Sequence, residues 1–298
     1  MIQFTVLGGY LGSGKTTLLN HILRNNNGVR FALLINDFGD INIDAQLIES
    51  QDENQINLAN GCVCCTLSDN FYDALETLEM LEPPPEHIIV EASGVANVEN
   101  LSQYGHGQHL QLAGIVVLAD AETVLEKAND KYVAQTVRRQ LKAADLIILN
   151  KTDLCSSEQR ERAQLWLDQE TGGTPVIPAA YCDVPVDMVL EPDLKQRVAR
   201  RERHTHESYA SWSYSSKASE SRAAVESFAN ALGPEVIRAK GLFACKDGGT
   251  LELQVVGRRK KVLVRSHSEH AGCQLVAIGL ADKFVSARMD ELAATYLS

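Results

Sequence analysis

The chain has 298 residues, 45% of them hydrophobic, which is enough to form the core of one large and one small domain. Its formal charge of −11 opposes binding to a phosphate backbone or an anionic membrane surface, so nucleic acid and membranes are excluded as expected partners. No apolar run approaches the roughly 20 residues that span a bilayer, and an odd number of cysteines, seven, does not suit a disulfide framework; we therefore expect a soluble cytoplasmic protein.

Short aliphatic and β-branched runs alternate with helical stretches as far as Ile177. Such runs predict buried strands, and their alternation with helices predicts an α/β fold whose mostly parallel sheet has helices on both faces. The predicted strands are Phe4–Leu7, Phe31–Ile35, His87–Val90, Gly114–Ala119, Leu146–Leu149 and Pro175–Ile177.

The pattern changes beyond Ile177. The charged stretch Lys195–Glu207 lacks a core-facing apolar pattern, which suits a linker or an exposed helix, and the aromatic patch SYASWSY follows it. We divide the chain into a first domain over residues 1–195, a linker over 196–207 and a smaller α+β domain over 208–298. The elements predicted there are a helix over Ser219–Leu232, strands over Gly241–Ala244, Thr250–Val256, Lys261–Val264 and Leu275–Ile278, and a helix ending near Leu297.

A phosphate-binding loop is predicted directly after the first strand. The segment GGYLGSGKTT contains G-x-x-x-x-G-K-[ST] and precedes an expected helix, so its backbone amides, its lysine and its threonine hydroxyl suit phosphates and Mg²⁺. A plain glycine-rich turn is the alternative, and the glycine spacing does not fit a dinucleotide-binding loop. The residues expected to bind nucleotide here are Gly9, Gly12, Ser13, Gly14, Lys15, Thr16 and Thr17, with Thr16 also holding Mg²⁺.

Two later segments stand where phosphate-sensing loops belong. Asp37 follows the second predicted strand, and Glu91 follows the third, with Gly94 close behind it. Glu91 could hold Mg²⁺ through water or orient a hydrolytic water, the Gly94 amide could meet the γ-phosphate, and Asp37 is a second Mg²⁺ candidate. A turn or helix cap is the alternative for either acid. No glutamine is obvious as a water-positioning residue, so we expect slow hydrolysis unless a partner or a metal completes the site.

Three cysteines, Cys62, Cys64 and Cys65, lie within four residues of one another between these two segments. Three thiolates can converge on one soft or borderline cation such as Zn²⁺ or Co²⁺, and a site one ligand short of a closed tetrahedron suits transient holding. Buried or redox-active thiols without a metal are the alternative.

A base-reading segment follows the strand predicted at Leu146–Leu149. The Asp153 carboxylate could accept hydrogen bonds from the guanine N1–H and 2-amino groups, which adenine does not offer as a pair. Asn150 could contact the base edge and support the loop, and the stem of Lys151 could lie along the base. The alternative for Asp153 is the start of the next helix.

Together these segments resemble the CobW-type GTPases, metallochaperone relatives of the urease and hydrogenase nickel-insertion GTPases. The matching stretches are GGYLGSGKTTLLNHIL, INDFGDINIDAQLI, NGCVCCTL, VEASGVANVENL and NKTDL, with VIRAKGLF and VAIGL in the tail. The resemblance implies a GTPase domain whose CxCC loop presents metal near the nucleotide, followed by a smaller domain that contacts clients.

The chain departs from that family in two places. Asp37 and Asp40 stand where relatives commonly carry glutamates, and the linker holds only His204 and His206 where several relatives have histidine tracts, which argues against metal storage. Whether those histidines bind metal is left open, as it is for two further groups: His267 and His270 with Glu269 and Cys273, and His106 with His109.

The function expected from sequence is GTP binding and hydrolysis coupled to delivery of zinc or cobalt to a client metalloprotein, with a homodimer as a further candidate assembly. The rival is a nucleotide-dependent regulatory switch or assembly factor whose cysteines sense zinc or redox state. Metal affinity that differs between the GTP and GDP states favours the first, and a reversible disulfide among the three clustered cysteines favours the second.

Overall fold

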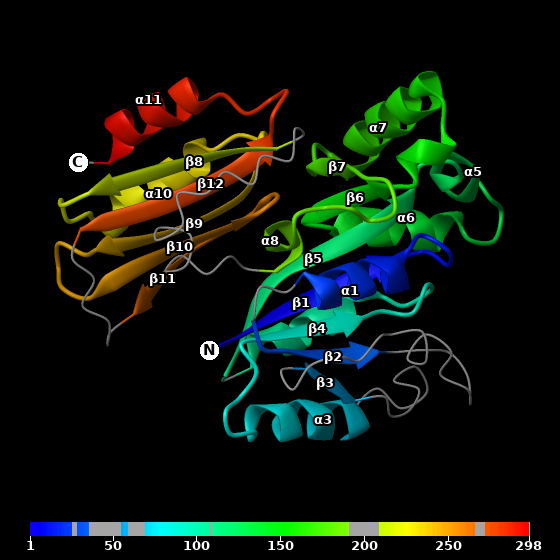
Figure 1. Ribbon diagram of the computed structural model, residues 1–298, viewed down its shortest axis with the longest axis horizontal. Helices are drawn as coiled ribbons and strands as arrows, with labels where there is room; N and C mark the ends of the chain where they lie inside the picture. Colours follow the sequence, from blue (N-terminus) through cyan, green and yellow to red (C-terminus); the bar gives the residue numbers. More distant parts are fainter. Residues whose placement is uncertain are drawn as a thin grey trace. The chain divides into compact units, whose positions relative to one another are not determined.

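A computed structural model describes residues 1–25, 29–35, 55–58, 69–107, 109–190, 209–265 and 272–297. The chain divides into two compact units, Met1–Glu191 and Pro192–Ser298, and each has its own sheet and core (Figure 1). Among the helices in the described ranges, none is long and apolar enough to cross a membrane.

The first unit is built on a parallel sheet. In its described residues the strand order is β3-β2-β4-β1-β5-β6-β7, and every pair of neighbours is parallel, which confirms the predicted fold class. The strands are β1 Ile2–Gly9, β2 Phe31–Ile35, β3 Gln55–Leu58, β4 His87–Glu91, β5 Leu110–Asp120, β6 Leu146–Asn150 and β7 Val176–Pro178.

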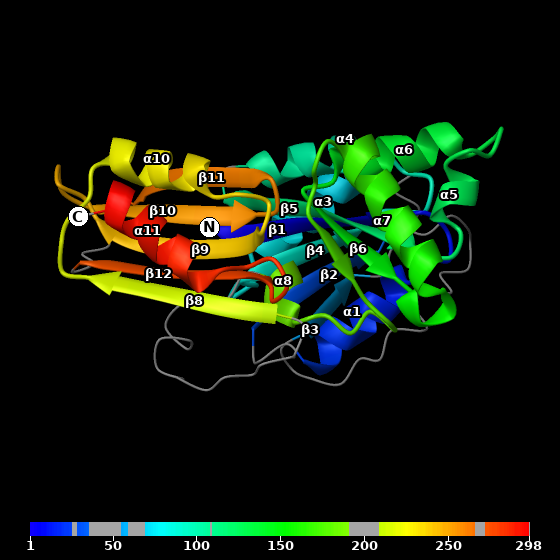
Figure 2. The same cartoon turned by 90° about the horizontal axis from the view of Figure 1, so that it is seen from above.

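Helices cover both faces of this sheet, so β1 is buried along its whole length. On one face Phe4 and Val6 share a core with apolar residues of α3, α4, α6 and α7, and α1 lies on the other face (Figure 2). The helices are α1 Lys15–Arg24, α3 Asp69–Glu79, α4 Val98–Ser102, α5 Val124–Lys127, α6 Ala134–Ala143, α7 Ser157–Thr171 and α8 Val186–Val189, with 3₁₀ turns η1 Gln103–His106 and η2 Thr152–Leu154.

The parallel arrangement brings the carboxyl ends of the central strands to one edge. The register pairs Leu7 with Glu91 and Asp120 with Asn150. Because ligands of open parallel sheets bind beyond the carboxyl ends of the strands, the loops after β1, β4, β5 and β6 are positioned to form one site.

The second unit is an antiparallel sheet in the order β11-β10-β9-β12-β8. Two helices pack on one of its faces around Phe228 and Leu253, as Figure 2 shows, and this arrangement confirms the predicted α+β class. Its elements are β8 Tyr209–Ser216, α10 Arg222–Ala231, β9 Val236–Ala244, β10 Thr250–Val256, β11 Arg259–Arg265, β12 Cys273–Leu280 and α11 Ser286–Tyr296.

Several elements differ from their predicted extents. β5 starts at Leu110 instead of Gly114, and β9 starts at Val236 instead of Gly241, because both strands continue through buried residues that precede the apolar runs. Helix α10 starts at Arg222 because the Ser221 hydroxyl accepts a hydrogen bond from the Ala224 amide and caps the helix. Strands β3 and β8 were not predicted.

Candidate functional site

The phosphate loop joins β1 to α1, as the motif requires. Gly9, Gly12 and Gly14 have φ angles of 138°, 77° and 107°, a region that glycine enters without steric cost. A Cβ on Gly14 would lie 2.4 Å from Asn150 Nδ2, and one on Gly9 would lie 2.7 Å from the Leu118 carbonyl oxygen. Glycine is therefore required at both positions by conformation and by contact.

Lys15, the first residue of α1, places its ammonium group under this loop. Its Nζ donates to the Gly9 carbonyl at 3.1 Å and lies 3.9 Å from Glu91 Oε1. Lys15 is 8% exposed and Glu91 is 3% exposed, so a buried cation and a buried carboxylate face each other across the ends of β1 and β4. Thr16, half-buried, and Thr17, exposed, lie in the first turn of the helix, whose N-terminal amides and dipole favour an anion.

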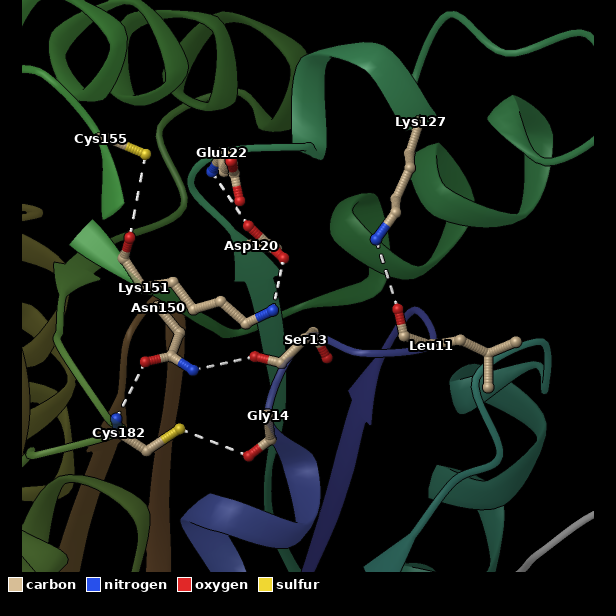
Figure 3. A network of polar contacts seen from close by, with 10 residues as sticks. All are labelled: Leu11, Ser13, Gly14, Asp120, Glu122, Lys127, Asn150, Lys151, Cys155 and Cys182. Carbon is tan, nitrogen blue, oxygen red and sulfur yellow. Dashed lines mark hydrogen bonds and ion pairs between the residues drawn. The ribbon is translucent and has the colours of Figure 1, made fainter. Parts of the chain in front are cut away.

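Asn150, the last residue of β6, ties two loops together (Figure 3). Its Nδ2 donates to the Ser13 carbonyl at 3.0 Å, and its Oδ1 accepts from the Cys182 amide at 2.9 Å. The Cys182 thiol in turn donates to the Gly14 carbonyl, with Sγ 3.3 Å from the oxygen. Burial raises the pKa of this thiol to about 12, so it stays protonated and remains a donor at neutral pH.

The two residues after Asn150 turn sharply away from the strand. Lys151 has a left-handed φ of 61°, and its Nζ forms an ion pair with Asp120 Oδ2 at 2.8 Å. The backbone amide and hydroxyl of Thr152 both donate to the Ala179 carbonyl, at 3.0 and 2.9 Å. Asp153 lies in η2, where it is exposed. Three polar contacts, to Asp120 and to the Ala179 carbonyl, thus hold the loop after β6, while Asp153 is exposed.

The segment after Glu91 lies against the phosphate loop. A Cβ on Gly94 would stand 2.8 Å from the Leu11 amide nitrogen, so only glycine allows this approach. Gln140 of α6 donates from Nε2 to the Gly94 carbonyl at 3.3 Å and to the Ala96 carbonyl at 2.9 Å. Lys127 Nζ also donates to a carbonyl of the phosphate loop, that of Leu11, at 3.3 Å (Figure 3).

Sequence reasoning missed Asp120, Cys182 and Gln140. Asp120 has the same signal that identified Glu91, because it is an acid at the end of a buried strand. Cys182 carries no such signal, since its role depends on a left-handed turn at Tyr181 and Cys182, with φ of 52° and 57°. In the sequence Gln140 has no feature that distinguishes it from other polar helix residues, and only the packing of α6 shows that it is buried.

Asp37, Asp40, Cys62, Cys64 and Cys65 lie outside the described residues, as do His204, His206, His267, Glu269 and His270. Within the described ranges no group of three or more His, Cys, Asp and Glu side chains is placed to hold a metal ion. His106 and His109 are exposed, and Cys273 is a buried thiol that donates to the Ala218 carbonyl. Burial, followed by the nearby Glu220 charge, raises the pKa of Cys273 to about 11.

Comparison with known proteins gives two family matches. Residues 3–178 match the family described as "CobW/HypB/UreG, nucleotide-binding domain", and residues 209–293 match the "Cobalamin synthesis protein cobW C-terminal domain". The "Zinc chaperone CobW" of a Sinorhizobium species is 29% identical over 342 aligned positions, which cover 98% of this chain and 95% of that protein.

Two further relatives have informative names. The "Zinc-regulated GTPase metalloprotein activator 1" of Schizosaccharomyces pombe is 37% identical over 168 positions, which cover 53% of this chain and 40% of that protein. The crystal structure of Zn(II)-bound YjiA GTPase from E. coli is 21% identical with a TM-score of 0.48, and the match covers 100% of this chain and 99% of that one. Because the first family matches more than half of the chain and the predicted motifs lie within it, the protein belongs to the CobW/HypB/UreG family of nucleotide-binding proteins.

Proposed function

We propose that this chain is a GTP-hydrolysing metallochaperone that binds zinc at Cys62, Cys64 and Cys65 and delivers it to a client metalloprotein. Membership of the family supports nucleotide binding, and relatives named as zinc chaperones and as a zinc-regulated GTPase support the coupling to zinc. These names favour zinc over cobalt as the cargo. The proposal rests mainly on the position of Lys15. Its Nζ lies 3.1 Å from the Gly9 carbonyl oxygen and 3.9 Å from Glu91 Oε1, beneath the phosphate loop, and Asn150 bonds that loop to the loop after β6.

The phosphates of GTP are assigned to the loop between Gly9 and Thr16. The backbone amides around Gly12, Ser13 and Gly14 would donate to phosphate oxygens, and the buried Lys15 ammonium would exchange its Gly9 contact for the β- and γ-oxygens. A cation that is already held under the loop needs little reorganisation when the phosphates arrive.

The guanine base is assigned to the β6 loop. The exposed Asp153 carboxylate would accept hydrogen bonds from two guanine donors. Lys151, whose ammonium is fixed by Asp120 at 2.8 Å, would lay its aliphatic stem along the base. The Asn150 amide is engaged by Ser13 and Cys182, so its role here is to hold the two loops in register rather than to contact the base edge.

The same edge of the sheet offers oxygen donors that suit Mg²⁺. Thr16, which is half-buried, lies in the first turn of α1, and the buried Glu91 ends β4, which pairs with β1. Hydroxyl and carboxylate oxygens are the ligands this hard cation prefers. When bound with GTP, Mg²⁺ neutralises the charge that develops on the phosphate oxygens. Asp37 is the second acid that we assign to this shell.

Hydrolysis is assigned to the neighbourhood of Glu91 and Gly94. The Glu91 carboxylate, held 3.9 Å from the Lys15 ammonium, could orient a water molecule toward the γ-phosphate. The Gly94 amide would donate to the γ-phosphate, and its close approach to Leu11 keeps it beside the phosphate loop. No glutamine is obvious in the sequence as a water-positioning residue, so we expect slow turnover that a partner or bound metal accelerates.

Zinc handling is assigned to the cysteines because of their place in the chain. They precede the strand that ends at Glu91 and follow the segment of Asp37. We infer that GTP orders both phosphate-sensing segments together with the cysteine loop, and that hydrolysis loosens them and releases zinc as a population shift. Residues 1–195 would carry this cycle in the cytoplasm, 196–207 would serve as the linker, and 208–298 would contact the client, with a homodimer as a second assembly to test.

The proposal is tested by measuring GTP turnover and zinc affinity on the same full-length preparation. Phosphate release from Mg·GTP should exceed release from Mg·ATP, and a chromophoric chelator should report tighter zinc in Mg·GTPγS than in Mg·GDP. Equal turnover of the two nucleotides would overturn the assignment of guanine. Equal zinc affinity in both states would leave a regulatory switch or an assembly factor, and a reversible disulfide among the three cysteines would favour the switch.

A further inference from the structure

A small cavity lies behind the phosphate loop. Its volume is about 20 Å³, and its lining includes Ser13, Asp120, Lys127, Val137 and Gln140. A water molecule needs a cavity of about 10–15 Å³ and two to four polar partners. The cavity therefore has room for a water molecule.

Two polar atoms of the lining require such a partner. Ser13 is 2% exposed and Gln140 is 1% exposed, and neither Ser13 Oγ nor Gln140 Oε1 has a hydrogen-bond partner within the described part of the chain. Buried polar atoms are almost always hydrogen-bonded, to protein or to ordered water. A water molecule in the cavity would donate to Gln140 Oε1 and exchange a hydrogen bond with the Ser13 hydroxyl.

The other end of the Gln140 amide holds a different segment. Its Nε2 donates to the carbonyls of Gly94 and Ala96, at 3.3 and 2.9 Å. These carbonyls belong to the segment that follows Glu91, whereas Ser13 belongs to the phosphate loop. One buried side chain of α6 therefore lies between the two segments assigned to the γ-phosphate.

We propose that Gln140 is a positioning residue that fixes the Gly94 segment relative to the phosphate loop, directly through Nε2 and through a bridging water molecule to Ser13 Oγ. This inference rests on the proposed GTP hydrolysis. Gln140 does not touch the reacting atoms; it sets the separation between the amide that meets the γ-phosphate and the loop that cradles it. Misplacement of such groups by about 1 Å can cost 10²-fold in rate.

The test uses Gln140→Met, which keeps the length of the side chain and removes its donor and acceptor. The matched control is Gln135→Met, the same change at an exposed position of the same helix. We expect Gln140→Met to lower kcat for GTP between about 10- and 100-fold, with GDP affinity and KM within about twofold because the phosphate loop and base loop remain tied by Asn150. Gln135→Met should match the wild type.

A second pair of variants tests the water bridge. If Ser13 and Gln140 share one water molecule, Ser13→Ala combined with Gln140→Met should be no slower than the slower single variant, because coupled sites are not additive. Val137→Ile, which adds a methylene group to the cavity lining without removing a polar atom, should slow kcat in the same direction. A high-resolution crystal structure should show a water oxygen within 3.2 Å of both Ser13 Oγ and Gln140 Oε1.

The outcomes separate the two proposals. If the wild-type protein hydrolyses GTP and Gln140→Met has the same kcat, this inference is wrong and the proposed function still stands. Equal falls of kcat, GDP affinity and thermal midpoint would also overturn it, because they indicate a merely structural role. Additive losses, or a crystal structure without that water, would overturn the bridge to Ser13. No GTP turnover by the wild type would overturn both.

Discussion

Asn150 Nδ2 donates to the Ser13 carbonyl oxygen at 3.0 Å, which joins the loop after β6 to the phosphate loop across the edge of the sheet. This contact explains why the last glycine of the motif tolerates no side chain, since a Cβ on Gly14 would lie 2.4 Å from the same nitrogen. The base loop and the phosphate loop are consequently one structural unit, and a change in the amide should affect nucleotide binding as a whole.

Replacing Asn150 with alanine should therefore weaken GDP and GTP alike. The change leaves the Ser13 carbonyl and the Cys182 amide without this partner, at a cost of roughly 1–3 kcal/mol for each buried group. We expect GDP affinity, measured by titration with a fluorescent analogue, to fall about tenfold or more. Asn150→Asp keeps the acceptor for Cys182 but turns an oxygen toward the Ser13 carbonyl, so GDP affinity should fall nearly as far as in Asn150→Ala. The exposed Asn230→Ala in α10 is the control, and equal loss in that variant would contradict the assignment.

Base choice should depend on Asp153. Asp153→Asn removes a charged acceptor from two guanine hydrogen bonds, each worth about 1.5–3 kcal/mol when one partner is ionised, and it supplies a donor that suits the xanthine 2-oxo group. Affinity for GDP should fall and affinity for XDP should rise in competition titrations, while Asp168→Asn on the exposed face of α7 changes neither. An unaltered preference for GDP in Asp153→Asn would remove Asp153 from the base site.

The sequence was sufficient to predict the fold class and the phosphate loop because both depend on local patterns. Strands β4 and β6 contain short aliphatic runs, β1 is rich in aliphatic and β-branched residues, and the loop carries a spaced motif between a strand and a helix. Strand β8 was missed because its signal is subtle: Ala210, Trp212 and Tyr214 alternate with serines, and those three pack toward the core.

The contacts that organise the site could not be predicted, because they join residues far apart in the chain. Cys182 reaches Gly14 across 168 positions, and Gln140 reaches Gly94 across 46. Neither residue has a motif, and each acts only because a turn or a helix presents its polar atoms at the sheet edge. The roles of Asp37 and the three clustered cysteines stay predictions, since those residues lie outside the described ranges.

Glu91 should separate binding from turnover. Glu91→Gln keeps the volume of the buried side chain but removes the charge 3.9 Å from the Lys15 ammonium. We expect GDP affinity within a few-fold of the wild type and kcat lowered by about 10²-fold or more, the range for loss of a group that orients or activates water. Lys15→Ala should instead lose nucleotide binding, and Thr16→Ala should lose the Mg²⁺ dependence with the activity. Unchanged kcat in Glu91→Gln would give that carboxylate a structural role.

The second unit should show a stability change at acid pH that is due to Glu252. This carboxylate is 1% exposed on β10 and is bonded to Arg265 and Gln254, with Lys240 Nζ 3.6 Å away. Burial alone would raise its pKa, but the Arg265 hydrogen bond and the Lys240 charge outweigh burial and hold the pKa of Glu252 below its usual range. A depressed pKa means that the stabilisation is complete above the unfolded value of about 4.3 and is lost as pH falls below it.

Glu252→Gln should accordingly lower the free energy of unfolding of the second unit by roughly 1–3 kcal/mol at pH 7, and the difference from the wild type should shrink below about pH 4.3. The chain has two tryptophans, so a Trp166→Phe background makes Trp212, in the second unit, the only tryptophan reporter in urea titrations. Glu226→Gln, which changes a partly exposed acid on α10 that pairs with Arg222, is the control. A difference between Glu252→Gln and the wild type that does not depend on pH would rule out the ionised carboxylate as its source.

Metal and nucleotide should each alter the affinity of the other by the same factor. The cysteine segment stands in the chain between the segment of Asp37 and the strand that ends at Glu91, and both are assigned to the γ-phosphate. If zinc binds more tightly in Mg·GTPγS than in Mg·GDP, linkage requires that zinc raise the affinity for GTPγS relative to GDP by the same factor. For coupled sites this factor corresponds to about 1–3 kcal/mol. Chelator competition in each nucleotide gives one side of this cycle, and nucleotide titrations with and without zinc give the other.

Cysteine variants show whether the coupling passes through the proposed ligands. Cys64→Ala and Cys65→Ala should lower the affinity for zinc. Binding of Mg·GTP in metal-free buffer should stay intact, because neither cysteine belongs to the phosphate loop or the base loop. Cys245→Ala, a half-buried thiol in the second unit, should change neither affinity. If zinc affinity is the same in both nucleotide states, or is unchanged by both cysteine substitutions, the chaperone mechanism is wrong. Nucleotide-dependent binding of a protein partner would then be the activity to test.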